Sequence, residues 1–136
     1  GLRLRELTPA TLQALRRFDD PVYLHQVVES GPEGLTRFLD VPEALASLEA
    51  RPRAAEWRVH FHVPIFLDKL EAFSSTRNFI EQVLALHRVQ PLSQHLEVET
   101  YTWNVLPPAL RTDAIEHAIA RELSWVRETL GEAAAA

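Results

Sequence analysis

A stretch of alternating polar and apolar residues, 95–103, constrains the fold more than any other part of the sequence. A period of two is typical of a β-strand, in which successive side chains point to opposite faces of a sheet. One face of this strand would carry His95, Glu97, Glu99 and Tyr101. Because buried carboxylates are costly unless they are paired, protonated or bound to a metal ion, a buried strand of this kind predicts a functional site.

Two further stretches, 22–28 and 57–64, are rich in β-branched and aromatic residues and are predicted to be strands. His60 and His62 lie two residues apart in the second stretch, so they share one face, whereas the pattern leaves the face of His25 open. Helices are predicted before, between and after the strands, because capping residues precede runs with helical spacing. The predicted helices begin at Thr8-Pro9, at Asp40, at Ser75 or Thr76, and at Pro107-Pro108.

Strands that alternate with helices predict a parallel sheet with right-handed connections. Three parallel strands are too few for a closed barrel, which leaves a small open α/β domain or the last three βα units of a TIM barrel. An open doubly wound sheet is apolar on both faces, whereas each of these strands has one polar face. The sequence therefore predicts a partial TIM barrel over residues 1–131, followed by a disordered tail at 132–136.

Composition excludes several classes of function. The chain has 136 residues, a net charge of −5 and no cysteine. The acidic balance counts against a nucleic-acid partner, and the lack of cysteine excludes disulfides and thiolate metal sites. No apolar run approaches the roughly 18 residues that a membrane span needs, and no signal peptide is visible. We therefore expect a cytoplasmic protein.

The polar faces of the predicted strands supply candidate metal ligands. In a parallel barrel the chemistry gathers at the carboxyl ends of the strands, which favours His62 over His60 and Glu99 over Glu97. Imidazole and carboxylate without thiolate suit a divalent ion such as zinc, manganese or iron. We expect Glu99, His62, His60 and His25 to be the metal ligands, with Glu99 and His62 as the catalytic residues.

A substrate pocket is expected beside these ligands. Tyr101 and Trp103, at the end of the third strand, would line it together with Glu97 and His95. In the alternative interpretation, His60, His95 and Glu97 form a buried hydrogen-bonded layer that only supports the site.

Three stretches, 22–27, 57–66 and 95–107, resemble the C-terminal part of EboE-type metabolite traffic proteins, which belong to the xylose-isomerase-like barrel superfamily. The resemblance implies that the strands are the sixth, seventh and eighth of a barrel whose first five are absent. It also implies a small-molecule metabolite as substrate, and a divalent metal held by Glu99 and by His62 or, failing it, His60. The implied function is sugar-phosphate-isomerase or epimerase-like chemistry in the processing or traffic of secondary-metabolite precursors.

Two other functions are considered. The first is a non-catalytic module that holds a small hydrophobic or isoprenoid-like metabolite, with Tyr101 and Trp103 as its apolar wall. The second is phosphodiester cleavage of the endonuclease-IV kind, which the acidic charge and the single lysine, Lys69, disfavour. Because a part-barrel exposes open sheet edges, we also expect the chain to associate with itself or with a missing N-terminal half of the barrel.

Overall fold

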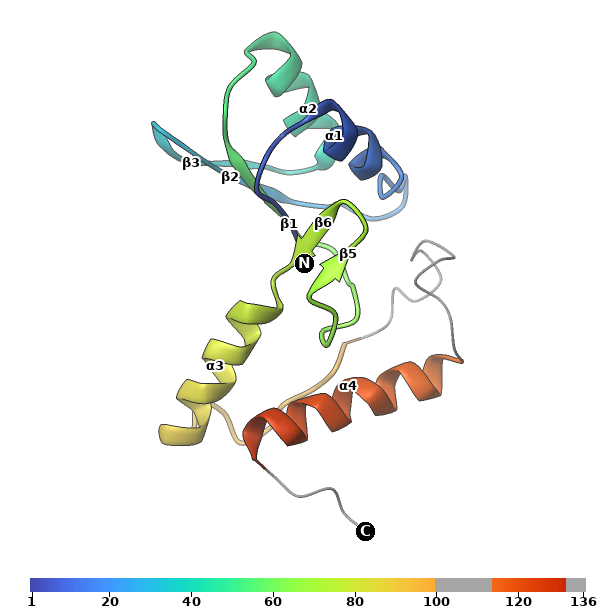
Figure 1. The fold of residues 1–136 in the computed structure, drawn as a ribbon, viewed down its shortest axis with the longest axis vertical. Coiled ribbons are helices and arrows are strands. Elements are labelled where there is room, and N and C mark those ends of the chain that lie inside the picture. Colours follow the sequence, from blue (N-terminus) through green and yellow to red (C-terminus); the bar gives the residue numbers. More distant parts are fainter. Residues whose placement is uncertain (100–113, 132–136) are drawn as a thin grey trace.

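The computed structural model describes residues 1–99 and 114–131. Within them the chain forms an antiparallel six-stranded sheet with the strand order β3-β2-β4-β1-β6-β5, accompanied by four helices (Figure 1). The strands are β1 (Leu2–Leu4), β2 (Val27–Gly31), β3 (Gly34–Phe38), β4 (Glu56–Val59), β5 (Lys69–Leu70) and β6 (Phe73–Ser75). The helices are α1 (Pro9–Arg16), α2 (Val41–Ala50), α3 (Arg77–Val89) and α4 (Ile115–Leu130).

The predicted partial TIM barrel with parallel strands is wrong, because every pair of neighbouring strands in the described sheet is antiparallel. The region around Gly31 and Gly34 shows why. It is a tight hairpin turn between β2 and β3, not the loop that leads from a strand to a helix. Gly34 has a φ of 110°, which glycine adopts without steric cost. A hairpin joins antiparallel strands, so no βα unit forms here.

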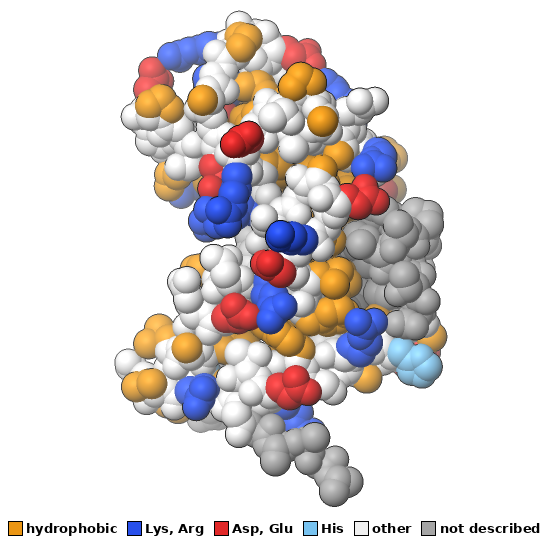
Figure 2. Space-filling view, in the orientation of Figure 1, with side chains coloured by type: hydrophobic (Ala, Val, Ile, Leu, Met, Phe, Trp, Pro, Cys, Tyr) orange, Lys and Arg blue, Asp and Glu red, His pale blue; other side chains and the backbone are white. Residues whose placement is uncertain are grey.

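The polar strand faces also have a different meaning from the one expected. An antiparallel sheet commonly has one face on the core and one in water. Arg3 on β1 pairs with Arg58 on β4, and both lie on the polar face, where Glu56 accepts two hydrogen bonds from Arg3 at 2.9 and 2.7 Å. Basic and acidic side chains lie next to one another at several places on the molecular surface (Figure 2). The polar face of this sheet is therefore solvated and does not line a barrel.

The strand predicted at 95–103 is wrong in its described part. Residues 95–99 have no regular secondary structure and pair with no strand of the described chain, and residues 100–103 lie outside the described residues. Leu96 is 50% exposed, so the apolar side of the alternation is not buried against a core. Alternation produces a strand only where a neighbouring strand supplies hydrogen bonds. The expected association with a missing half-barrel has no support without the barrel, whereas the expected self-association stays a prediction.

The helix predictions are more accurate than the strand predictions, because they rest on local capping interactions. Thr8 caps α1 by accepting a hydrogen bond from the N–H of Thr11 at 3.2 Å. Asp40 caps α2, accepting from the N–H of Val41 at 2.8 Å. Gly131 ends α4 with a φ of 79°, as a left-handed cap does. The predicted helix starts at Thr8 and Asp40 are confirmed, whereas the start predicted for the last helix, 107–108, and the tail at 132–136 lie outside the described residues.

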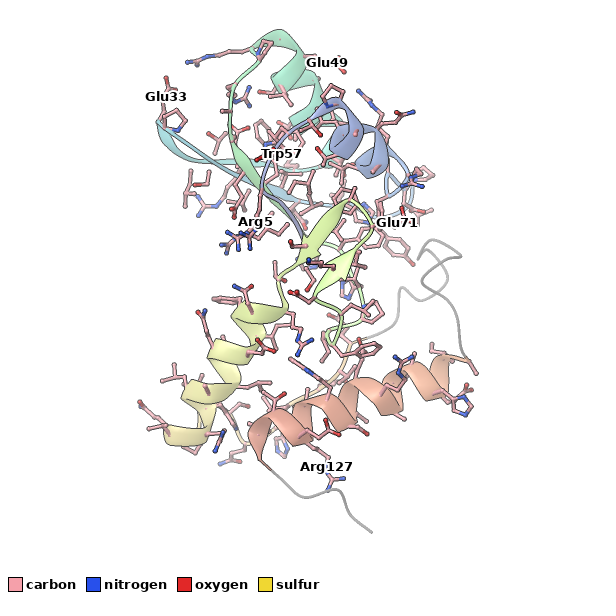
Figure 3. The ribbon with its side chains drawn as sticks, in the orientation of Figure 1. Arg5, Glu33, Glu49, Trp57, Glu71 and Arg127 are labelled. Carbon is pink, nitrogen blue, oxygen red and sulfur yellow. The ribbon has the colours of Figure 1, made fainter. Side chains whose placement is uncertain are left out.

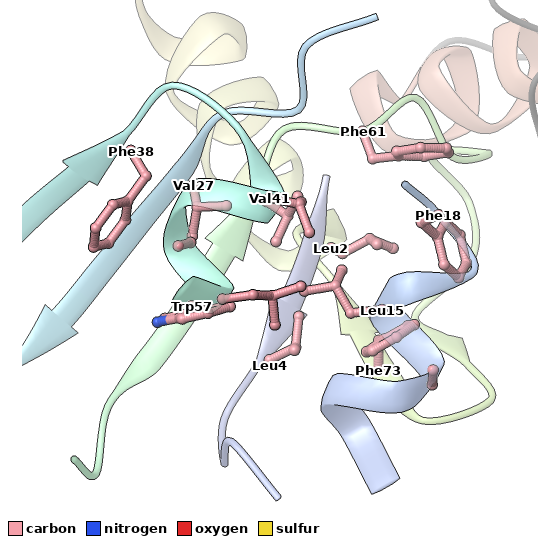
Figure 4. Packing of buried hydrophobic residues seen from close by; sticks show 14 of the residues in the cluster. Leu2, Leu4, Leu15, Phe18, Val27, Phe38, Val41, Trp57, Phe61 and Phe73 are labelled. Atoms are coloured by element: carbon pink, nitrogen blue, oxygen red, sulfur yellow. The ribbon is translucent and has the colours of Figure 1, made fainter. Parts of the chain in front are cut away.

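The hydrophobic core lies between the sheet and the helices α1 and α2. Across β2, β4 and β1, Val27 is opposite Val59, and Val59 is opposite Leu2, so all three point to one face. Trp57, two residues before Val59 on β4, belongs to the same face and is the largest fully buried side chain, and Leu15 of α1 packs against this face (Figures 3 and 4). Each fully buried side chain of this kind contributes about 1.5–3 kcal/mol by leaving water. This core fixes the position of the carboxyl end of β4, and the segment that follows β4 forms part of the candidate site.

No helix within residues 1–99 and 114–131 has both the length and the apolar character needed to cross a membrane.

Candidate functional site

A cavity of about 700 Å³ lies between four parts of the chain: the segment 60–65 after β4, helix α3, the segment 93–99 and helix α4. Helices α3 and α4 lie beyond the edge of the sheet, away from α1 and α2 (Figure 1). Cavities that bind small organic molecules usually measure about 300–1,000 Å³. The size of this cavity therefore matches a ligand of that class.

The walls of the cavity are mainly apolar and come from the two helices. Residues that recur every three or four positions share one face of a helix. On α3 and α4 this spacing directs a set of aliphatic side chains to the cavity. The set consists of Ile80, Val83, Leu84, Leu123, Val126 and Leu130.

Contacts with the segment 64–67 hold both helices in place. Arg77, at the start of α3, donates to the carbonyl oxygen of Phe66 at 2.9 Å, and its guanidinium lies 5.3 Å from the centre of a ring of Trp125. Arg121 of α4 lies over the ring of Phe66 at 4.4 Å. Cation–π contacts of this kind contribute about 0.5–2 kcal/mol. The segment that follows β4 therefore positions both walls of the cavity.

The lining of the cavity also has polar side chains, which include four of the residues singled out from the sequence. His60, His62, Glu97 and Glu99 all line it. The alternation predicted for this segment is confirmed, because Phe61 and Val63 are buried while His60 is exposed and His62 half-buried. The rings of His60 and His62 lie 5.4 Å apart. Burial first and then the nearness of His62 lower the pKa of His60, although Glu99 acts in the opposite direction.

Glu122 is the residue of the cavity wall that the sequence reasoning missed. Its side chain is 4% exposed, and its Oε1 accepts a hydrogen bond from the N–H of Ile65 at 2.9 Å. Its Oε2 is buried and has no hydrogen-bond partner among the described residues. Burial raises the pKa of the Glu122 carboxyl, although the Ile65 N–H and nearby His62 act in the opposite direction. A sequence signal existed, because Glu122 interrupts the apolar face between Ile119 and Val126.

Two other predicted site residues, His25 and His95, do not line the cavity. His25 is 5% exposed and its ring stacks on Phe61 at 4.5 Å; the nearby N–H of His60 donates to Gln26. Burial lowers the pKa of His25, although nearby aspartates act against it. His95 is exposed in a turn in which its N–H donates to Ser93 at 3.2 Å. Tyr101 and Trp103 lie outside the described residues.

The expected metal set was Glu99, His62, His60 and His25. In residues 1–99 and 114–131, no three histidine, aspartate or glutamate side chains are grouped so that they could hold a metal ion. His25 lies against Phe61 and not in the cavity wall, so it does not join the other three. A zinc, manganese or iron site therefore stays a prediction, and no chemistry below depends on it.

Comparison of the chain with protein-family models, with curated proteins and with solved structures gave no match. The comparisons therefore add no support to the resemblance to EboE-type proteins or to an isomerase.

Proposed function

We propose that this chain binds a small, largely apolar organic molecule in the cavity between the segment 60–65, α3 and α4. The observation that carries the proposal is the composition of the cavity: aliphatic walls from two helices, together with a few imidazoles and carboxylates in the lining. Binding sites for small molecules commonly combine an apolar lining with a few polar groups that fix the orientation of the ligand.

The place of the cavity in the fold supports binding. The main core consists of the sheet with α1 and α2, and the aliphatic residues of the cavity wall on α3 and α4 do not belong to it. An apolar cavity lowers stability, because its lining lacks packing partners. A ligand would supply those contacts. Each Å² of apolar surface that the ligand removes from water contributes about 25 cal/mol.

Filling the cavity tests the proposal. N-phenylnaphthylamine, a neutral apolar dye that fluoresces when it leaves water, is the probe. We expect saturable binding at one site per chain, and we expect Val126→Trp to weaken it by about tenfold or more, because the indole occupies the space of the dye. The measurement is a fluorescence titration of the purified protein.

The control applies the same change outside the cavity. Val89, at the end of α3, is 86% exposed and does not line the cavity, so Val89→Trp should leave the affinity for the dye within about twofold. Circular dichroism establishes that both variants are folded. Non-saturable fluorescence in the wild type, or equal affinities in the two variants, would contradict the proposed site.

A further inference from the structure

The cavity carries an excess of negative charge. Among the described residues that line it, Glu97, Glu99 and Glu122 are acidic, whereas the basic groups, apart from the imidazoles, are the guanidinium of Arg127 and the amino group of Gly1, whose pKa burial lowers to about 6. Arg127 lies in the last turn of α4 and is exposed (Figure 3). Burial keeps the pKa of His60 below its ordinary value, which disfavours a positive charge on this imidazole. The charge balance of the wall therefore favours a cationic ligand over an anionic one.

The carboxylate of Glu122 is the position in the cavity where a cationic group would bind. It shares one face of α4 with Val126 and Leu130, since the three residues are four positions apart, and all three line the cavity. The N–H of Ile65 fixes one carboxylate oxygen at 2.9 Å, and the other oxygen, buried, has no partner in the described part of the chain. A buried carboxylate with an unused acceptor costs free energy that a bound cationic donor would offset.

We infer that the ligand is an amphiphilic amine, whose protonated nitrogen donates to the free oxygen of Glu122 while its apolar body lies against the aliphatic walls of α3 and α4. The inference rests on the proposed function and names the chemical class of the ligand. An ammonium group suits this position because it donates up to three hydrogen bonds and accepts none. Its positive charge is also opposite in sign to the excess charge of the cavity wall.

Three probes with one rigid apolar body and different polar groups test the inference: adamantylamine, adamantanol and adamantanecarboxylate. Each competes with N-phenylnaphthylamine for the wild-type protein at neutral pH. We expect the amine to bind about tenfold or more tightly than the alcohol, because hydrogen bonds between charged groups are roughly twice as strong as neutral ones. The carboxylate should bind most weakly of the three.

The variant Glu122→Gln should remove the preference for the amine and leave the alcohol within about threefold of its wild-type affinity, since the glutamine carbonyl still accepts from Ile65. Glu128→Gln is the matched control: the same change on the same helix, at an exposed residue outside the cavity wall. It should leave all three affinities unchanged.

The outcomes separate the two claims. Equal affinities for the amine and the alcohol, or an amine preference that survives Glu122→Gln, would overturn the inference while saturable dye binding still supports the cavity. Failure of the dye and of all three probes to bind would overturn the proposed function itself.

Discussion

Replacing Glu29 with alanine is expected to lower the free energy of unfolding by about 3 kcal/mol, the largest effect of any single change considered for this chain. Glu29 is 5% exposed and lies in the middle of strand β2. Its carboxylate accepts from the indole Nε1 of Trp57 at 2.8 Å and from Nε of Arg53 at 2.7 Å. Alanine would leave both donors without this acceptor, the indole in the fully buried core and the guanidinium mostly buried.

The pKa of Glu29 gives this prediction a pH dependence. Burial raises the pKa, but the hydrogen bonds from Arg53 and Trp57 and the charge of Arg53 outweigh it, so the pKa lies below its ordinary value. A depressed folded-state pKa means that the contribution of Glu29 is complete above the unfolded value of about 4.3. It is lost as the pH falls through the folded value. The difference between wild type and variant should therefore shrink in acid.

Glu33→Ala is the matched control for Glu29→Ala. Glu33 lies in the turn of the same β2–β3 hairpin and pairs with Arg51 at 2.9 Å, but both side chains are exposed (Figure 3). Exposed ion pairs contribute about 0–1 kcal/mol. Urea unfolding at neutral pH measures both variants. Similar losses of stability in the two variants would show that Glu29 does not hold the core as described.

The variant Glu122→Gln is expected to be more stable than the wild type, by about 1–2 kcal/mol, at a pH well above the ordinary pKa of a glutamate side chain. The amide oxygen of glutamine still accepts from the N–H of Ile65, while the cost of burying a charge next to an unused acceptor disappears. Most substitutions of buried residues destabilise, so a gain here would be unusual. Residues that lower stability are often retained for function.

The contribution of Glu122 to stability depends on pH with a sign opposite to that of Glu29. Burial raises the folded-state pKa of Glu122 above its unfolded value, so the folded wild type holds the proton more tightly. Its stability therefore falls as the pH rises from about 4.3 through the folded value, a slope that the glutamine variant lacks. Urea unfolding of both proteins at about pH 5 and about pH 8 measures the difference. If the wild type is at least as stable as the variant at the higher pH, the result would contradict the claim that the buried charge of Glu122 destabilises the fold.

Local signals in the sequence predicted the helices. The prediction of the sheet failed because strand direction depends on pairing between segments that are far apart in the sequence. Thr8 and Asp40 each act within a few residues of their own position, so their capping of α1 and α2 could be predicted directly from the sequence. Strand direction depends on which segments pair. The short strand β1 and the hairpin of β5 and β6 carry little pattern of their own, and their places in the sheet depend on distant partners.

The candidate site could be predicted in part. The spacing of His60 and His62 places both on one side of an extended segment, whether that segment enters a barrel or follows an antiparallel strand. Glu97 and Glu99 line the same cavity although their segment is not a strand. Glu122 could not be linked to them, because only the packing of α4 against residues 64–67 brings it there. Its role depends on tertiary contacts that no local spacing encodes.

The most direct test of the proposed cavity is to locate a bound probe by nuclear Overhauser effects between adamantylamine and the methyl groups of the protein. We predict contacts from the cage protons to the methyls of Leu84 and Val126, on facing walls of the cavity, and none to Leu45 in the core beneath α2. Contacts that instead gather on the exposed end of α3 around Val89, or no contacts at a saturating probe concentration, would contradict the account.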